Sequence, residues 1–253
     1  SSDVCSSDLM STFIALLFWF ATAVIIFGLA FKIRQYWVTP APLKIPTTPA
    51  PTTRTGVIFR MAKEVVVFES LFKSNKWIWI FGWMFHMSLA LVLARHIRYF
   101  QEQPWFWVNI IQPFGKYAAF TMVIGLLGLL ARRFVVARVR YISAPSDYLM
   151  LIMLIFIGIS GLMMQLIVRP DIIAIKEYFL SWMGFSITDL PISTPLVIHL
   201  LLVALLMIIF PFSKLLHAPG IFFSPTRNQV DNPREKRHIS KWAAELETDN
   251  NKG

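Results

Sequence analysis

The chain has 253 residues, 56% of them hydrophobic, with a formal net charge of +10 and a mean hydropathy of +0.60. These values exclude an ordinary water-soluble domain, and long uncharged apolar runs indicate an integral membrane protein. In a soluble protein such a charge would point to nucleic acid, whereas in a membrane protein it is typical of loops that stay in the cytoplasm.

The one cysteine, Cys5, lies in a polar, serine-rich leader that precedes the first methionine, Met10. We expect this leader, residues 1–9, to be non-native, and it is excluded from the predicted fold. The remaining residues contain no cysteine. They therefore predict no disulfide, no iron–sulfur cluster of the chain's own and no covalently attached haem.

Five apolar runs are long enough to cross a bilayer as helices, at about 1.5 Å per residue. They predict an all-α membrane domain over residues 10–217 and a polar tail over residues 218–253. A short surface helix and a loop are expected between the fourth and fifth spans, over residues 169–193. The five spans lie at about residues 11–31, 77–97, 114–131, 148–168 and 195–215.

The loop between the first and second spans, residues 32–75, has two parts. Residues 38–55 are rich in Pro and Thr and predict an extended linker. The residues that follow predict an amphipathic helix that lies on the inner membrane surface or, equally, docks a partner. Its apolar stripe consists of Val57, Met61, Val65, Phe68 and Phe72, and Arg60, Lys63 and Glu64 lie away from that stripe.

The distribution of Lys and Arg orients the five spans. Eight of these residues lie between the first and second spans, four between the third and fourth, and seven in the tail when Lys214 at the end of the fifth span is counted with it, against five on the opposite side. Because cytoplasmic loops carry the excess of positive residues, this count predicts an N-terminus outside and a C-terminus in the cytoplasm.

Two of the spans contain four of the chain's five histidines. Ionisable side chains inside a membrane are rare and usually functional. The pair on the fifth span is 18 residues apart, or five helical turns, so both rings project from one face. The pair on the second span is 10 residues apart, which separates the rings by roughly 80° around the helix. The four residues are His86 and His96 on the second span, and His199 and His217 on the fifth.

Depth in the membrane determines how these histidines pair. Under the predicted topology the two spans are antiparallel, so His96 and His199 lie toward the outer side. His86 and His217 lie toward the inner side. The crossed pairing of His96 with His217 would separate the rings by roughly 30 Å of depth, too far for one porphyrin. The straight pairing predicts an outer and an inner haem about 21 Å apart, with Pro211 kinking or unwinding the fifth span to ease its longer spacing.

A haem with two imidazole ligands has no open iron position and suits one-electron transfer. Arg95 and Arg98, beside His96, are candidates to pair with the haem propionates. Two other roles remain open for the four histidines, namely polar contacts between helices and the ligation of zinc. The fifth histidine, His238, lies among Lys and Arg in the tail and is expected to be solvated.

Together, these residues resemble the NarI-like dihaem cytochrome b subunits of respiratory nitrate reductase. One branch is closer, the DsrM-type cytochrome b subunits of DsrMKJOP sulfite-reduction-associated complexes. The resemblance covers about residues 11–242, and two stretches carry it, FESLFKSNKWIWIFGWMFHMSLALVLARHIRYF and FPFSKLLHAPGIFFSPTRNQVDNPRE.

The resemblance implies two haem b groups, an outer one held by His96 and His199 and an inner one held by His86 and His217. It also implies a quinone site, with menaquinone as the expected substrate, in which Lys116 takes part. The alternative for Lys116 is an ordinary interfacial lysine. The implied partners are a cytoplasmic iron–sulfur subunit resembling DsrK and heterodisulfide reductase, together with other membrane and periplasmic subunits.

We therefore expect an electron-transfer subunit of a quinone-linked oxidoreductase complex, located in the cell inner membrane. Its tail motif FFSPTRNQVDNPRE is expected to act as a docking arm for the partner. The first rival is the gamma subunit of a respiratory nitrate reductase, which performs the same chemistry in another complex. The second is a non-redox membrane anchor or scaffold.

Overall fold

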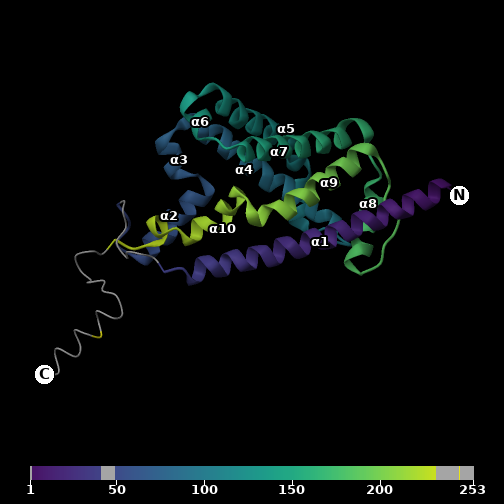
Figure 1. The fold of residues 1–253 in the computed structure, drawn as a ribbon, viewed down its shortest axis with the longest axis horizontal. Coiled ribbons are helices and arrows are strands. Elements are labelled where there is room, and N and C mark those ends of the chain that lie inside the picture. The colour runs from purple at the N-terminus through teal and green to yellow at the C-terminus, as the bar shows by residue number, and fades with distance from the viewer. Residues whose placement is uncertain (1, 41–48, 232–244, 246–253) are drawn as a thin grey trace. The chain divides into compact units, whose positions relative to one another are not determined.

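The structure, a computed structural model, describes residues 2–40, 49–231 and 245 (Figure 1). In this part the chain is helical and has no strand. Contacts divide it into two compact units, treated separately below: unit 1, which comprises Ser1–Phe27 and Ser70–Phe212, and unit 2, which comprises Gly28–Glu69 and Ser213–Gly253.

Five helical segments of the described chain are long and apolar enough to cross a membrane, which confirms the predicted number. Each begins or ends beyond the predicted apolar run, and the fifth, which begins one residue earlier than expected, also ends three residues earlier. The segments are Ser7–Val38, Lys76–Phe100, Phe106–Val135, Pro145–Val168 and Thr194–Phe212.

In unit 1, local signals fix where the spanning helices begin. α4 (Lys76–His96) starts after Asn75, whose side chain accepts a hydrogen bond from the backbone N–H of Ile78 at 3.1 Å. α7 (Pro145–Met163) and α9 (Thr194–Ile209) each have a proline in the first turn, where a missing N–H has no cost. α3 (Glu69–Ser74) precedes α4, and α5 (Phe106–Val135) follows it after the 3₁₀ turn η1 (Ile97–Phe100).

α5 packs between α4 and α7 (Figure 1). Gly125 is what lets α5 approach α4 so closely, because a Cβ added there would lie 3.0 Å from both the carbonyl oxygen of Phe81 and the backbone nitrogen of Phe85. The helix carrying two of the four histidines is thereby held tightly against its neighbour. The buried side chains at this contact are Phe85, Met122, Leu126 and Ile155.

A second core cluster joins α1 (Ser2–Val38), α8 (Ile172–Met183) and α9. The expected helix between the fourth and fifth spans is present as α8, but one of its faces is buried. Tyr178 is 1% exposed and donates from its hydroxyl to the carbonyl of Ser11 at 2.7 Å. Trp182 donates from Nε1 to the carbonyl of Ala15 at 3.2 Å. Because its hydroxyl is buried, the pKa of Tyr178 is raised to about 12.

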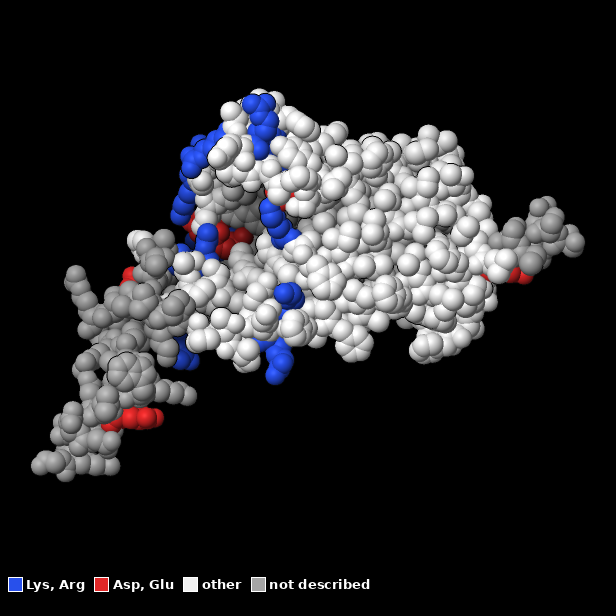
Figure 2. Space-filling model, in the orientation of Figure 1, with Lys and Arg blue, Asp and Glu red and all other residues white. Residues whose placement is uncertain are grey.

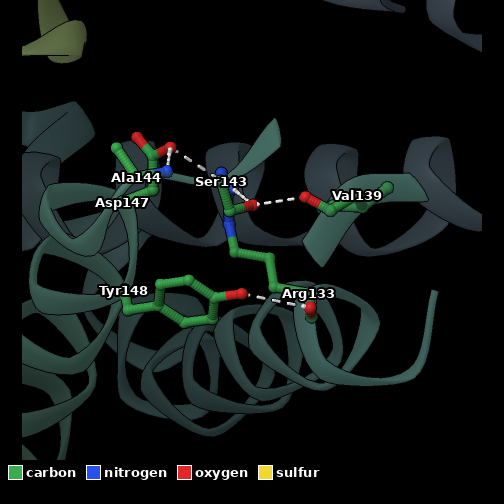
Figure 3. A network of polar contacts seen from close by, with 6 residues as sticks. All are labelled: Arg133, Val139, Ser143, Ala144, Asp147 and Tyr148. Atoms are coloured by element: carbon green, nitrogen blue, oxygen red, sulfur yellow. Dashed lines mark hydrogen bonds and ion pairs between the residues drawn. The ribbon is translucent and has the colours of Figure 1, made fainter. Parts of the chain in front are cut away.

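The turn from α5 through α6 (Ala137–Ile142) to α7 is held by a polar network (Figure 3). Arg133 donates to the hydroxyl of Ser143 at 2.7 Å and forms an ion pair with Asp147 at 3.6 Å. Asp147 also accepts a hydrogen bond from the backbone N–H of Ala144 at 3.0 Å, which closes the first turn of α7. Tyr148 donates to the carbonyl of Arg133 at 3.2 Å, so both ends of the turn are tied together.

On the face shown in Figure 2, Lys and Arg gather over α6 and the adjoining end of α5. The surface over the middle of α5, α7 and α9 shows neither basic nor acidic residues on that face. An uncharged band beside a basic end is the pattern of a membrane-crossing bundle.

In unit 2, the tail contacts both the final turns of α1 and the helix α2 (Arg54–Val66). The tail, taken from here on to begin after the fifth span at residue 213, forms η4 (Lys214–Leu216), α10 (His217–Gly220), η5 (Ile221–Phe223) and α11 (Pro225–Asn228). The ring of Phe223 lies 5.7 Å from that of Tyr36, and Arg227 forms an ion pair with the buried Glu64 of α2. The backbone N–H of Asp231 donates to the carbonyl of Pro51 at 3.0 Å.

The predicted apolar stripe of this loop is wrong in two respects. The helix stops at Val66, and Phe68 has a positive φ of 54°, so Phe72 belongs to the separate helix α3. On α2 itself, Val57 faces inward together with Glu64, whereas Val65 is exposed. Residues 41–48 of the predicted Pro/Thr linker lie outside the described part of the chain, as does His238.

Candidate functional site

The outer pair of histidines, His96 and His199, is brought together within unit 1. His96 is the last residue of α4, and His199 lies in the second turn of α9. Their ring centroids are 6.3 Å apart and the ring planes differ by 15°. The two rings that the sequence analysis paired therefore lie next to each other, and their role as ligands of one haem stays a prediction.

Hydrogen bonds fix the tautomer of each ring. Nδ1 of His96 lies 2.6 Å from the carbonyl oxygen of Val92, and Nδ1 of His199 lies 3.1 Å from that of Ile157. A carbonyl only accepts, so in each neutral ring the proton is on Nδ1 and the lone pair is on Nε2. A backbone carbonyl on the second nitrogen is a common outer-shell partner of metal-binding histidines.

The spacing of the rings fits a shared metal ion. An imidazole nitrogen lies about 2.0–2.1 Å from a bound metal such as zinc. Two rings whose centroids are 6.3 Å apart are therefore close enough for both to bind one ion. Within the described residues no group of three or more His, Cys, Asp or Glu is placed to hold a metal ion. Haem b takes two ligands from the protein, and His96 with His199 supplies two imidazoles, so this donor pair fits a haem.

Arg98 supplies a second test of the fit. Its guanidinium donates to the side-chain oxygen of Gln112 and to the hydroxyl of Tyr99, both at 3.0 Å. Its Nε is buried and has no hydrogen-bond partner in the described structure. A buried donor on a cation, two residues from His96, is suited to a carboxylate such as a haem propionate. Arg95, the other predicted propionate residue, instead donates to Gln165 at 2.9 Å.

The inner pair is divided between the two units. His86 lies on α4 in unit 1, and His217 begins α10 in unit 2. Nδ1 of His86 lies 2.7 Å from the carbonyl of Gly82, and Nδ1 of His217 lies 2.9 Å from that of Lys214, so both rings have the same tautomer as the outer pair. The pairing of His86 with His217 stays a prediction.

The predicted effect of Pro211 is confirmed. α9 ends at Ile209, and residues Phe210–Phe212 form a 3₁₀ turn around the proline. His217 therefore does not lie on the same continuous helix as His199. The prediction that both rings project from one face of a single helix, five turns apart, is therefore wrong, because the rise of an ideal α-helix does not extend from His199 to His217.

Lys116, the predicted quinone residue, lies on α5 with an exposed side chain. Its ammonium is 5.9 Å from the ring centroid of Tyr117. Its carbonyl accepts a hydrogen bond from Gln165 at 3.2 Å, and Gln165 in turn accepts from Arg95. This chain of contacts connects the backbone of Lys116 to the helical turn that carries His96. Its role toward a quinone stays a prediction.

Sequence reasoning missed three residues of this site. Ser160 on α7 is 5% exposed, and its hydroxyl lies 3.0 Å from Nδ1 of His199 while donating to Ile157 at 3.0 Å. Gln165 lies in a π-helical turn, Met164–Val168, a local widening that is frequent at functional sites. Gln112 bridges Arg98 to the backbone of α4. For Ser160 and Gln165 the one available signal was a polar residue inside an apolar run, and Gln112, outside the predicted spans, gave none.

Comparison with known proteins assigns the family. The sequence profile of the nitrate reductase gamma subunit matches residues 54–233, a range that includes all four histidines. The chain belongs to the nitrate reductase gamma subunit family. The expected likeness to these subunits is thereby confirmed at the level of the family.

Two curated relatives extend over most of the chain. One, from Archaeoglobus fulgidus, is named Hdr-like menaquinol oxidoreductase cytochrome b-like subunit and is 33% identical over 267 residues, which cover 88% of this chain and 80% of the relative. The other, from Archaeoglobus profundus, has the same name and is 28% identical over 266 residues, which cover 87% of this chain and 79% of the relative. With five helices able to cross a membrane, this family member is a multi-pass membrane protein.

Proposed function

We propose that this family member is a membrane cytochrome b subunit that transfers electrons between the menaquinone pool and an iron–sulfur partner in the cytoplasm. The observation that carries the proposal is the parallel pair His96 and His199, with ring centroids 6.3 Å apart. The names of the two relatives, menaquinol oxidoreductase cytochrome b-like subunits, support the same activity.

The chain's own residues would hold the outer haem in three ways. His96 and His199 supply the two nitrogen ligands, each oriented by a hydrogen bond at Nδ1. Arg98 offers its buried Nε to a propionate. Haem b held by two imidazoles supplies one-electron transfer without an open position for oxygen. His86 and His217 would hold the inner haem in the same way.

Lys116 is proposed to bind the quinone. An ammonium on a flexible stem can donate a hydrogen bond to a quinone oxygen and orient the ring near the outer pair. Oxidation of a quinol releases two electrons and two protons, and the electrons would pass one at a time to the outer and then the inner site. In the orientation predicted from Lys and Arg, the protons would leave on the outer side.

The proposed partner is a cytoplasmic subunit resembling DsrK and heterodisulfide reductase, as in a DsrM-type sulfur-metabolism complex of the inner membrane. Beyond the expected leader the chain has no cysteine, so any cluster that accepts its electrons must be held by another subunit. The Hdr-like names of the relatives agree with such a partner. The predicted topology places the tail on the partner's side.

A second candidate is the gamma subunit of a nitrate reductase, which the family match favours. The identity of the subunit that copurifies separates the two. A molybdenum-containing subunit would establish nitrate reduction, and a heterodisulfide-reductase-like iron–sulfur subunit would establish the sulfur-linked role.

The test is reduction of the purified subunit by a menaquinol analogue, followed by the absorbance of reduced b-type haem. We expect the menaquinol analogue to reduce the haem of the wild-type subunit. Lys116→Ala should need about tenfold more quinol for the same reduction, because one charge-assisted hydrogen bond of about 1.5 kcal/mol is lost. Lys176→Ala is the control, a half-buried lysine on the same predicted side whose ammonium donates to the carbonyl of Glu102. A preparation without Soret absorbance would establish a scaffold instead, and an equal effect of the two variants would remove Lys116 from the quinone site.

A further inference from the structure

The helix α2, outside the electron-transfer site, has two faces of different chemistry. Its inward face contains the buried residues Val57 and Glu64. Its outward face covers about half of the helix circumference and, apart from the exposed Thr55 in the first turn, is apolar in the middle. The apolar residues of this face are Ile58 (67% exposed), Phe59 (66%), Val65 (38%) and Val66 (59%), with the exposed Ala62 between them.

The charges of α2 are arranged around that face. Arg54 and Lys63, both exposed, lie at its two edges. The single acidic residue of the helix, Glu64, points the other way and pairs with Arg227 of the tail. The outward face therefore offers an apolar surface bordered only by cations, which complements the acyl chains and phosphates of an anionic bilayer surface.

Contacts within unit 2 keep α2 beside the membrane end of α1. The rings of Tyr36 and Trp37, in the last turn of the first span, lie 5.7 and 6.3 Å from that of Phe223. Four residues later, Arg227 forms its ion pair with Glu64. The tail is thus a strap that runs from the end of a spanning helix to the inward face of α2.

The chain itself also restricts α2 to the membrane surface. α2 lies between a span that ends at Val38 and a span that begins at Lys76, and nine residues lie between its last residue and the second of these spans. Both spans must meet the water on the same side of the bilayer. A helix in this short connection cannot move far from the headgroups.

We propose that α2 lies in the headgroup region of the leaflet where α1 ends, with Ile58, Phe59, Ala62, Val65 and Val66 facing the lipid. The tail strap through Arg227 and Glu64 sets the rotation of the helix about its own axis. This role does not depend on the electron-transfer function. It assigns to lipid a surface that would otherwise be open to a cytoplasmic protein.

The test uses single cysteines in the full-length chain, with Cys5 changed to Ser, reconstituted in bilayers that contain an anionic lipid. Nitroxide labels are placed at Ile58→Cys, Phe59→Cys and Ala62→Cys, and the control label at Thr52→Cys, an exposed position just before the helix. Collisions with molecular oxygen, which concentrates in lipid, are compared with collisions with a water-soluble nickel chelate. At the three helix positions we expect the collision rate with oxygen to exceed that with the chelate at least threefold. At the control position we expect the chelate to give the higher collision rate.

Equal access of the chelate to positions 52, 58, 59 and 62 would overturn the proposal. Protection that appears only when the cytoplasmic partner is added would also overturn it and assign the face to protein. Ala62→Cys is the smallest change and keeps the test decisive if the larger replacements fail to fold. A bimane label at that position gives a second measurement, since lipids brominated near the headgroup should quench it at least twofold.

The strap has its own variant, Arg227→Ala, which removes the partner of the buried Glu64. We expect the label at Ala62→Cys to become more mobile and to lose at least half of its preference for oxygen. Lys214→Ala, another basic residue of the tail, is the control and should leave the preference unchanged. An unchanged preference in Arg227→Ala would show that the strap does not orient α2.

Discussion

Ser160→Ala should raise the reduction potential of the outer haem. The hydroxyl of Ser160 lies 3.0 Å from Nδ1 of His199, as a second acceptor beside the carbonyl of Ile157 at 3.1 Å. Acceptors at this nitrogen make the imidazole a stronger electron donor and so favour the oxidised iron. Loss of one acceptor should therefore make reduction easier.

The size of the shift follows from the strength of the bond. A neutral hydrogen bond contributes about 0.5–1.5 kcal/mol, and for a one-electron couple about 1.4 kcal/mol corresponds to about 59 mV. The whole bond would thus give at most about 60 mV. Because Nδ1 keeps the carbonyl of Ile157, we expect about 20–40 mV.

The assay is a spectroscopic redox titration of the purified protein, with both b-type haems resolved. Ser88→Ala is the matched control, because Ser88 is equally buried but bonds to the hydroxyl of Thr121 at 2.6 Å and to no histidine. The reasoning is refuted if Ser160→Ala leaves both potentials within about 10 mV of wild type, well below the shift expected from a bond of this strength. A shift confined to the inner haem would refute the assignment of Ser160 to His199.

Three further predictions concern stability, measured by thermal unfolding in detergent. Asp147→Ala should lower the free energy of unfolding by about 1–3 kcal/mol, because it removes the cap of α7 and leaves Arg133 without its carboxylate. Asp147→Asn should lose less stability than Asp147→Ala, and equal values for the two variants would contradict this. Gly125→Ala should cost about 1–3 kcal/mol, since its methyl group meets the backbone of α4, and an unchanged melting temperature would show that the helices can separate freely. Burial raises the pKa of Tyr178 to about 12, so its contribution to stability is complete below about pH 10 and is lost as the pH rises toward 12. Tyr178→Phe should not show this loss. Identical profiles of melting temperature against pH for wild type and variant would contradict the prediction.

The spanning helices were predictable because bilayer thickness imposes a minimum length on each apolar run. The ends of these helices were harder to predict. α5 begins at Phe106, eight residues before the predicted start at residue 114, because a helix continues into the interface where apolar character fades. The buried face of α8 was missed because the partners of Tyr178 and Trp182 lie on α1, more than 160 residues away in sequence. No local pattern carries that information.

The residues of the site were likewise predictable only in part. The proximity of His96 and His199 was predictable from helical rise and the antiparallel order of the two spans, whereas the contact of Ser160 depends on which helix lies behind His199. The stripe on α2 failed for a related reason. Helical periodicity describes two apolar faces equally well, and only the contact between Glu64 and Arg227 shows which one turns inward.

The most direct test of the central claim is the haem content of the purified chain, measured per polypeptide in wild type and in His199→Ala. The account predicts two b-type haems in wild type and one in the variant, with the inner haem's spectrum retained. A colourless wild type, or a variant that keeps both haems, would contradict the assignment of His96 and His199 as ligands of one iron.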